Sequence, residues 1–307
     1  MKFAFVFPGQ GSQTIGMLSE FSEETVVRET FSQASSLLGY DLWEFAQTGP
    51  EERMALTTNT QPLIYTASCA LWRLWCETTQ ARPAFVAGHS LGEYAALFAA
   101  QAFDFATGLE LIAFRARAMQ EAFPEGRGAM AAVIGLDPAT IVETLKGIEP
   151  TVEAVNFNSP QQVVIAGFTE AIDAAEEALR AKGAKRVLRL KVSGPFHSSL
   201  MQKARLALES RLAVVKLAAP AIAVVQNVNA RPTLEAGKLK AGLGEQMVAP
   251  VLWEQSVRAL AARGVEACVE CGPGKVLSNL MRRTEPSVAV YTTESQASFA
   301  AATEALS

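Results

Sequence analysis

Two short motifs contain the only histidines of the 307-residue chain, and both could support nucleophilic catalysis. Ser90 follows His89 in the pentapeptide 88–92 (Gly-His-Ser-Leu-Gly), which has the Gly-x-Ser-x-Gly form of a nucleophile elbow. A serine nucleophile needs a base, and histidine is the usual base near neutral pH. Because His89 is adjacent to Ser90 on a tight turn, its side chain points elsewhere. We therefore expect His197, in the segment 194–198 (Gly-Pro-Phe-His-Ser), to be the base.

Two backbone segments could stabilise the negative charge that develops on a substrate oxygen. The first is the start of the helix expected after Ser90, where the N–H group of Leu91 points toward the nucleophile. The second contains Gln10, which stands between two glycines directly after the first apolar segment. A dinucleotide-binding loop is excluded there, because Thr14 replaces the third glycine of the pattern Gly-x-Gly-x-x-Gly. Gln10 is therefore a candidate for an oxyanion site.

A third group that orients the histidine is harder to find. A hydrolase triad places an acid between the serine and the histidine in chain order, and the aspartates there are Asp104, Asp137 and Asp173. The first two precede predicted helices and are typical N-caps, and the third lies on a charged helix face. We therefore expect a backbone carbonyl group, rather than a carboxylate, to orient His197.

Arg115 and Arg117 lie on a predicted helix whose other residues are largely apolar. Such an arginine either extends its side chain to the surface or binds an anionic group. The pattern alone leaves both interpretations open.

The cysteines do not form a metal-binding pattern. Cys268 and Cys271 make one Cys-x-x-Cys pair with no second pair and no nearby histidine, whereas a structural zinc site needs four ligands. We interpret them as reduced thiols near the end of a strand. We expect no metal and no tightly bound cofactor.

Strands and helices in alternation must position these residues. We predict buried strands at 2–7 and 84–88 and a helix at 91–100, so that Ser90 lies at a strand–turn–helix junction. Another helix is predicted over 61–79, with Thr60 as its N-cap and Pro62 in its first turn. The other elements predicted outside 127–193 are helices at 23–38, 105–122, 198–213, 236–247, 253–263 and 275–283, and strands at 221–226 and 265–270.

Residues 128–192 have a different pattern. We expect strands at 129–134, 152–157, 162–166 and 185–190, and helices at 138–146 and 169–182. The order β-α-β-β-α-β is typical of a ferredoxin-like unit, whereas strands alternating with helices elsewhere indicate a mostly parallel sheet. The sequence therefore predicts an α/β fold with a small lobe between Ser90 and His197.

Composition and charge narrow the classes of function. Half of the residues are hydrophobic, and the net charge of −4 gives no excess of basic residues that would indicate nucleic acid binding. The apolar N-terminal run is too short for a signal peptide, and no segment has the roughly 20 uninterrupted apolar residues of a membrane span. We expect a cytoplasmic protein with no membrane or nucleic acid partner, and we predict a monomer because nothing indicates an obligate oligomer.

Six motifs, in order along the chain, resemble those of the malonyl-CoA:acyl carrier protein transacylase family. The likeness spans essentially the whole chain and implies an α/β-hydrolase-like main subdomain, residues 1–126 and 194–307, with an inserted ferredoxin-like subdomain, residues 127–193. The matching segments are 7–13 (Phe-Pro-Gly-Gln-Gly-Ser-Gln), 88–94 (Gly-His-Ser-Leu-Gly-Glu-Tyr), 115–120 (Arg-Ala-Arg-Ala-Met-Gln), 156–160 (Asn-Phe-Asn-Ser-Pro), 194–198 (Gly-Pro-Phe-His-Ser) and 272–277 (Gly-Pro-Gly-Lys-Val-Leu).

The resemblance implies a role for each candidate in the reaction. Ser90 attacks the malonyl thioester and His197 is the base. The backbone N–H groups of Gln10 and Leu91 form the oxyanion hole. The resemblance also singles out Arg115, rather than its neighbour two residues on, as the partner of the malonyl carboxylate.

Supporting roles follow for five further residues. The resemblance places Gln246 near the base, with a backbone carbonyl there orienting the imidazole, and Asn158 at the lobe junction near the coenzyme A or carrier cleft. His89 supports the elbow from behind. Met119 and Phe196 could narrow the pocket against an acyl group with an alpha-methyl branch.

The resemblance implies two substrates, malonyl-CoA and an acyl carrier protein, and a malonyl-serine intermediate that serves both in turn. Malonyl transfer of this kind supplies fatty acid synthesis. A stand-alone acyltransferase of polyketide synthesis, a serine esterase or thioesterase, and a non-catalytic binding subunit are the alternatives. Five basic residues of the small lobe could bind the acidic carrier or form a solvated face: Lys182, Lys185, Arg186, Arg189 and Lys191.

Overall fold

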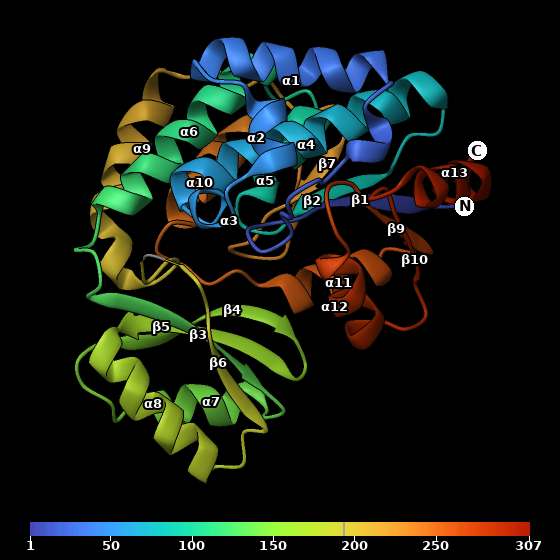
Figure 1. Cartoon of the computed structure of the whole chain (residues 1–307). Helices are drawn as coiled ribbons and strands as arrows, with labels where there is room; N and C mark the ends of the chain where they lie inside the picture. Colours follow the sequence, from blue (N-terminus) through green and yellow to red (C-terminus); the bar gives the residue numbers. More distant parts are fainter. Residues whose placement is uncertain (193) are drawn as a thin grey trace.

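The computed structural model describes residues 1–192 and 194–307, which form two β-sheets and their surrounding helices (Figure 1). The larger sheet has six strands, namely β1 (Phe3–Phe7), β2 (Phe85–Gly88), β7 (Ala223–Val225), β8 (Pro232–Thr233), β9 (Ala267–Glu270) and β10 (Ala289–Thr292). Their order is β10-β9-β1-β2-β7-β8, and every pair is parallel except β7 with β8. This mainly parallel sheet confirms the predicted α/β fold.

Helices cover both faces of the larger sheet. Strand β1 is buried throughout because its phenylalanines face one layer of helices, where Phe5 packs on Trp75 with ring centroids 4.9 Å apart, while Ala4 and Val6 face the other layer. The two layers comprise α1 (Thr25–Leu38), α2 (Leu42–Thr48), α3 (Glu51–Met54), α4 (Thr57–Thr78), α5 (Gly92–Ala99), α6 (Phe105–Glu121), α9 (Gln202–Val214), α10 (Ala236–Glu245), α11 (Trp253–Ala261), α12 (Val276–Thr284) and α13 (Gln296–Leu306), with 3-10 turns η1 (Ser19–Phe21) and η2 (Ser199–Met201).

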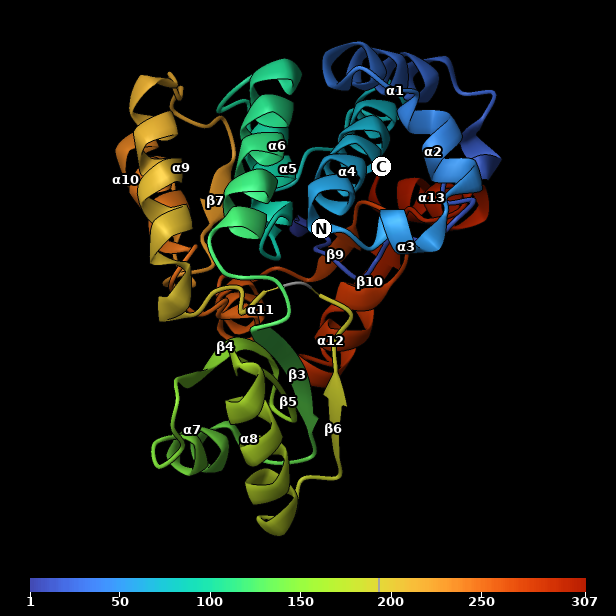
Figure 2. The ribbon, with the colours of Figure 1, turned by 60° about the vertical axis from the view of Figure 1, so that its left-hand side comes forward.

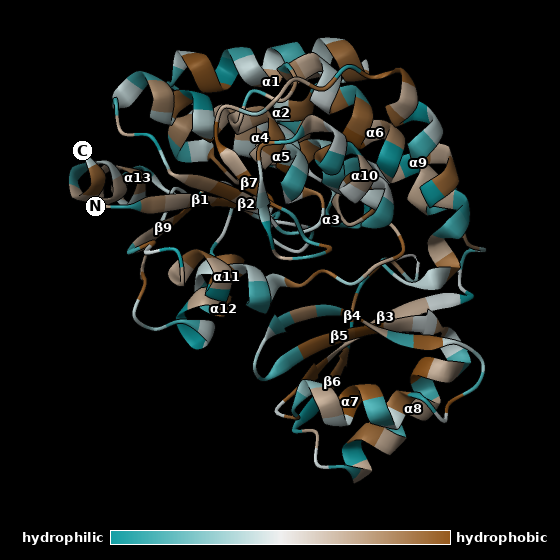
Figure 3. Cartoon of the chain, turned by 180° about the vertical axis from the view of Figure 1, so that it is seen from behind, coloured by the Kyte–Doolittle hydropathy of each residue, from teal (hydrophilic) through white to brown (hydrophobic). Residues whose placement is uncertain are grey.

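Hydropathy follows this layering. The central strands β1 and β2 are mostly brown in Figure 3, whereas the helices around them alternate between brown and teal. Strands buried on both faces read as continuous apolar runs, and covering helices are apolar on one face only. The predicted strands 2–7 and 84–88 correspond to β1 and β2 within one or two residues.

The smaller sheet is entirely antiparallel and lies beside one end of the body (Figure 2). Its strands are β3 (Gly128–Ile134), β4 (Val152–Ser159), β5 (Gln162–Phe168) and β6 (Arg186–Arg189), and its helices are α7 (Pro138–Leu145) and α8 (Thr169–Ala181). The strand order β4-β5-β3-β6 is that of the predicted β-α-β-β-α-β unit. The predicted boundaries of the two subdomains, after residues 126 and 193, stay a prediction. Ser193, at the second boundary, lies outside the described residues.

Backbone hydrogen bonds join strand β4 of the small sheet to the segment that precedes α11 in the body. The Val251 amide donates to the Val155 carbonyl at 2.8 Å, and the Phe157 amide donates to the Val251 carbonyl at 2.9 Å. Asn156 and Val251 form an isolated parallel bridge between these segments. The small sheet is therefore held against the body next to the carboxyl end of β2.

The predicted start of the long helix is wrong. Helix α4 begins at Thr57 and its N-cap is Leu56, so Thr60 and Pro62 lie inside the helix. Thr60 is not a cap because its hydroxyl donates to the carbonyls of Met54 and Leu56, and the Leu56 carbonyl already accepts the first helical amides. Five short or C-terminal elements were not predicted: α2, α3, β8, β10 and α13.

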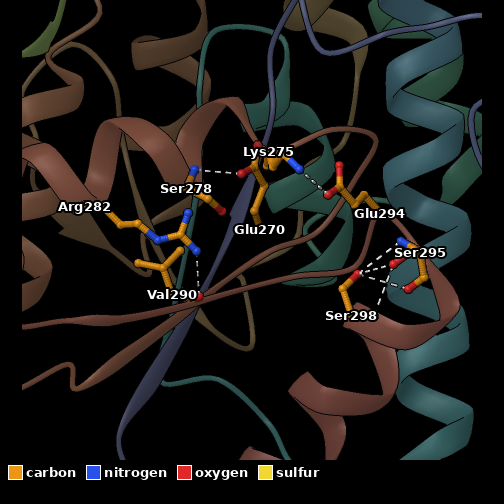
Figure 4. A network of polar contacts seen from close by, with 8 residues as sticks. All are labelled: Glu270, Lys275, Ser278, Arg282, Val290, Glu294, Ser295 and Ser298. Carbon is orange, nitrogen blue, oxygen red and sulfur yellow. Dashed lines mark hydrogen bonds and ion pairs between the residues drawn. The ribbon is translucent and has the colours of Figure 1, made fainter.

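A buried carboxylate closes the junction between β9 and α12 (Figure 4). Glu270 is the last residue of β9, and its two carboxylate oxygens accept from the amides of Leu277 at 3.0 Å and Ser278 at 2.7 Å. Burial raises the pKa of Glu270 to about 6. The negative charge is stabilised there because the first amides of a helix have no partner within the helix.

None of the helices in the described ranges is long and apolar enough to cross a lipid bilayer.

Candidate active site

The predicted elbow is formed between β2 and α5. Ser90 has a φ of 53°, a left-handed conformation that a non-glycine residue adopts at an energetic cost. Positions 88 and 92 are glycines because neither has space for a side chain. A Cβ atom at Gly88 would overlap the backbone of Gly92, and one at Gly92 would overlap the Phe7 carbonyl. The turn therefore presents the Ser90 side chain beyond the carboxyl edge of the parallel sheet.

Ser90 and His197 meet although 107 residues separate them in sequence. The Ser90 Oγ atom lies 2.7 Å from Nε2 of His197, and Nδ1 of the same ring lies 2.7 Å from the Gln246 carbonyl oxygen. A carbonyl oxygen can only accept, so Nδ1 carries the proton and Nε2 is free to accept from the serine hydroxyl. The structure therefore places a backbone carbonyl in the position where a triad has its acid.

The aspartates considered for that position lie elsewhere. Asp104 and Asp137 accept from the amides of Thr107 and Thr140 and cap α6 and α7, as predicted. Asp173 is on α8 and pairs with Arg189.

The imidazole of His197 is held neutral. Burial, reinforced by the positive charge of Arg115, lowers the pKa of His197 to about 3, and the hydrogen bond to the Gln246 carbonyl only partly opposes this. A base must be unprotonated to accept a proton, so His197 is ready to act at neutral pH.

Arg115 is fully buried beside the nucleophile. One terminal nitrogen donates to Gln61 Oε1 at 2.7 Å, and the other donates to Gln246 Oε1 at 2.9 Å and to Ser90 Oγ at 3.1 Å. Within residues 1–192 and 194–307, no carboxylate lies at ion-pair distance from this guanidinium. Arg117, on the same helix, is exposed. A buried cation whose acceptors are all neutral is a strong site for an anionic ligand.

Two backbone N–H groups beside Ser90 are unpaired. Neither the Gln10 amide nor the Leu91 amide donates to an acceptor in the described part of the chain. The Gln10 side chain is engaged elsewhere, since its Oε1 accepts from Thr57 and its Nε2 donates to the Ala55 carbonyl at 3.4 Å. What Gln10 offers to the site is therefore its main chain.

His89 points away from Ser90 and toward the small sheet. Its Nε2 donates to Asn158 Oδ1 at 2.8 Å, and its ring lies 5.7 Å from that of Trp253. The Asn158 side chain also donates to Gln162 at 3.3 Å. The pair fastens the elbow to β4 and therefore lies at the lobe junction.

A cavity of about 80 Å³ opens onto these groups. Met119 and Phe196 form part of its wall together with Ser90, Arg115 and His197. A larger neighbouring cavity of about 470 Å³ shares Gln10, Leu190 and Val192 with it, and Lys191 lies on its rim. A small cavity at Ser90 therefore adjoins a larger one.

Three residues of the site were missed in the sequence: Gln61, Glu93 and Asn227. Asn227 Oδ1 accepts from the Ser90 amide at 2.7 Å, and Glu93 accepts from both Gln246 and the Asn227 amide. A weak signal existed for Glu93, a charged residue one helical turn after the nucleophile on an otherwise apolar helix. Nothing in the sequence marks Asn227.

Cys268 and Cys271 are buried free thiols, and burial raises the pKa of both. No cluster of three or more potential metal-ligating side chains occurs among the residues that the structure describes.

Comparisons with known proteins agree with this geometry. A model of the acyl transferase domain matches residues 4–300. The malonyl CoA-acyl carrier protein transacylase of Escherichia coli K12 is 47% identical over 306 residues and covers 99% of both chains, and that of Salmonella typhimurium is 49% identical over 287 residues, 92% of both. A malonyl-transacylase solved in complex with its type II polyketide acyl-carrier protein has a TM-score of 0.97 and 43% identity, covering 99% of this chain and 100% of that one.

Proposed function

The chain belongs to the malonyl CoA-acyl carrier protein transacylase family, and from this premise we propose that it transfers malonyl from malonyl-CoA to the thiol of an acyl carrier protein. The environment of Arg115 is the observation that supports malonyl as the acyl group. Its guanidinium donates to Ser90 Oγ at 3.1 Å and has only neutral acceptors, so the carboxylate of a short acyl group can bind it while the thioester carbon reaches the serine.

The proposed reaction has two halves. His197 Nε2 takes the Ser90 proton as Oγ attacks the thioester carbon, and the amides of Gln10 and Leu91 stabilise the oxyanion. The C–S bond then breaks, and the coenzyme A thiolate takes the proton from His197. The carrier thiol reverses these steps, since it gives its proton to His197, attacks the malonyl-serine ester and releases Ser90.

Acyl-group size is set by the chamber around Ser90. Met119 and Phe196 are both almost fully buried in its wall, and close-packed interiors leave little free volume around such side chains. We expect an alpha-methyl branch to be excluded. Turnover of methylmalonyl-CoA at a rate close to that of malonyl-CoA would contradict this role.

The carrier protein is proposed to dock on β6. This edge strand carries exposed Arg186 and Arg189, and Lys185 and Lys191 flank it. The chain then continues to Leu190 and Val192, which line both cavities next to Ser90. An acidic carrier bound to the strand could therefore deliver its phosphopantetheine arm to Ser90 through the larger cavity.

Fatty acid synthesis is the proposed destination of the malonyl group, and stand-alone service to a polyketide synthase is the alternative. A comparison of kcat/KM for the carrier proteins of the two pathways separates them. The monomer predicted from sequence is tested by light scattering.

One labelling experiment tests the reaction. The protein is incubated with malonyl-CoA, and intact-protein and peptide mass spectrometry follow a malonyl adduct on Ser90, which holo carrier protein should then remove. Ser90→Ala should abolish the adduct. Rapid release of free malonate would indicate a hydrolase, and absence of any adduct in the wild type would indicate a binding subunit.

A further inference from the structure

Glu93 is a buried carboxylate that no step of the proposed reaction uses. It lies on α5 one turn after the nucleophile and is 1% exposed. Its Oε2 atom accepts two hydrogen bonds, from the Asn227 amide at 3.1 Å and from Gln246 Nε2 at 2.9 Å. Both donors belong to residues that hold Ser90 in place.

The two partners of Glu93 bind the two peptide groups that flank the Cα atom of Ser90. Asn227 Oδ1 accepts from the Ser90 amide at 2.7 Å, and Gln246 Nε2 donates to the Ser90 carbonyl at 3.1 Å. The Asn227 side chain also donates to the Gly88 carbonyl. The left-handed backbone of Ser90 is therefore held by a network that converges on one carboxylate oxygen.

Among the residues that the structure describes, Glu93 is the one charged acceptor at the NH₂ end of the Gln246 amide. Two neutral acceptors lie there as well, the Ser90 carbonyl and Asn227 Oδ1, the latter at 3.2 Å. An amide group has one donor end and one acceptor end, and a bond to an ionised acceptor is roughly twice as strong as one to a neutral acceptor. Glu93 therefore contributes most to holding the NH₂ end on its side, which leaves Oε1 facing Arg115 at 2.9 Å. A neutral side chain at position 93 would leave only neutral acceptors there and would weaken the hold on Oε1 and on the buried guanidinium.

We propose that Glu93 is a positioning residue, which fixes the Gln246 amide and through it holds the Arg115 guanidinium where a substrate carboxylate binds. This inference rests on the proposed function. It predicts that Glu93 controls the preference for carboxylated acyl groups more strongly than it controls acyl transfer itself.

The charge on Glu93 sets the conditions of the test. Burial raises the pKa of Glu93 to about 7, although the hydrogen bonds from Asn227 and Gln246 and the charge of Arg115 oppose the rise. Assays at pH 8 keep the group ionised in the wild type. The readout is the second-order rate of Ser90 acylation by malonyl-CoA and by acetyl-CoA, followed by rapid quench and mass spectrometry.

We expect Glu93→Gln to lower the malonyl rate on the order of tenfold or more, with a smaller loss for acetyl, because the guanidinium is displaced from its productive position. Glu93→Asp keeps a carboxylate at this position and is the conservative variant. It should retain more of the malonyl-to-acetyl ratio than Glu93→Gln does. A general loss of structure would instead lower both rates together.

Glu270→Gln is the matched control. It removes another buried carboxylate that accepts two amide hydrogen bonds, but Glu270 contacts α12 and not Arg115. This variant should lower stability without changing the malonyl-to-acetyl ratio.

If Glu93→Gln does not fold, the malonyl-to-acetyl ratio is measured in Gln246→Met instead. This variant removes the side-chain amide and keeps the backbone carbonyl that orients His197. An unchanged malonyl-to-acetyl ratio in whichever folded variant is measured overturns the role of Glu93. Absence of a malonyl adduct in the wild type would instead overturn the proposed function.

Discussion

The large and small sheets of this molecule contribute to the site in opposite ways. The body around β1 and β2 holds Arg115 and Gln246 fully buried beside the half-buried Ser90, each bonded to partners far away in sequence. The small sheet presents β6, an edge strand whose basic side chains are exposed, with Arg189 paired to Asp173 on the surface. From this comparison we expect bond-making to depend on a few fixed atoms and carrier recognition to depend on charge spread over a surface.

The largest effect is expected at the centre of the buried network. His197→Ala removes the base, and we expect the rate of Ser90 acylation to fall on the order of 10³- to 10⁴-fold. Single-turnover quench experiments with malonyl-CoA measure this rate. His89→Ala is the control, since His89 bonds Asn158 and not Ser90, and it should cost far less. Equal losses in both variants would contradict the assignment of the base.

A smaller effect, but a change of selectivity, is expected at Arg115. Arg115→Ala should lower kcat/KM for malonyl-CoA roughly 10- to 100-fold, the value of hydrogen bonds to a charged group. It should lower the rate with acetyl-CoA much less, because acetyl has no carboxylate. Arg117→Ala, two residues along the same helix and exposed, should change neither rate. A parallel loss for both acyl groups would show that Arg115 does not select the carboxylate.

Substitutions at the exposed strand β6 should have modest effects on carrier binding, and these effects should depend on the salt concentration. Lys185→Glu with Arg186→Glu should raise the KM for carrier protein by about tenfold at low ionic strength and leave the KM for malonyl-CoA unchanged. Steady-state kinetics at two salt concentrations measure this, and Lys238→Glu, on α10 of the body, is the control. If both KM values rise together, β6 is not the docking surface.

The effect that is smallest at neutral pH concerns the proton on His197. Its pKa of about 3 lies below the ordinary value of 6.5, so between these pH values the unfolded chain binds a proton that the folded protein does not bind. The folded state should therefore lose stability as the pH falls from 6.5 toward 3, and this loss should be absent above pH 6.5. NMR titration measures the His197 pKa directly, because the chain has only two histidines. A His197 midpoint near 6.5 would contradict the lowered pKa.

Local chemistry explains which parts of the site could be predicted. The elbow follows from glycines that no other residue could replace, and the pairing of Ser90 with His197 follows from the scarcity of histidine. The contact between Glu93 and Asn227 could not be predicted, because it joins positions 134 residues apart that the sheet brings together.

Helix boundaries show the same limit. Thr60 is a residue type that often caps helices, yet α4 begins four residues before the predicted start, so that the threonine hydroxyl bonds the preceding turn. Strand β10 and helix α13 escaped prediction because their apolar patterns are short and become meaningful only against β9 and the body.

The sequence separation within the active site has a consequence for synthesis of the chain. Ser90 must wait for a histidine made 107 residues later, and that histidine must wait for the carbonyl of Gln246, a further 49 residues on. A growing chain that has not reached residue 246 therefore lacks the carbonyl that orients His197. Contacts between such distant positions form late in folding, so we expect a partly made chain to react slowly with cellular thioesters.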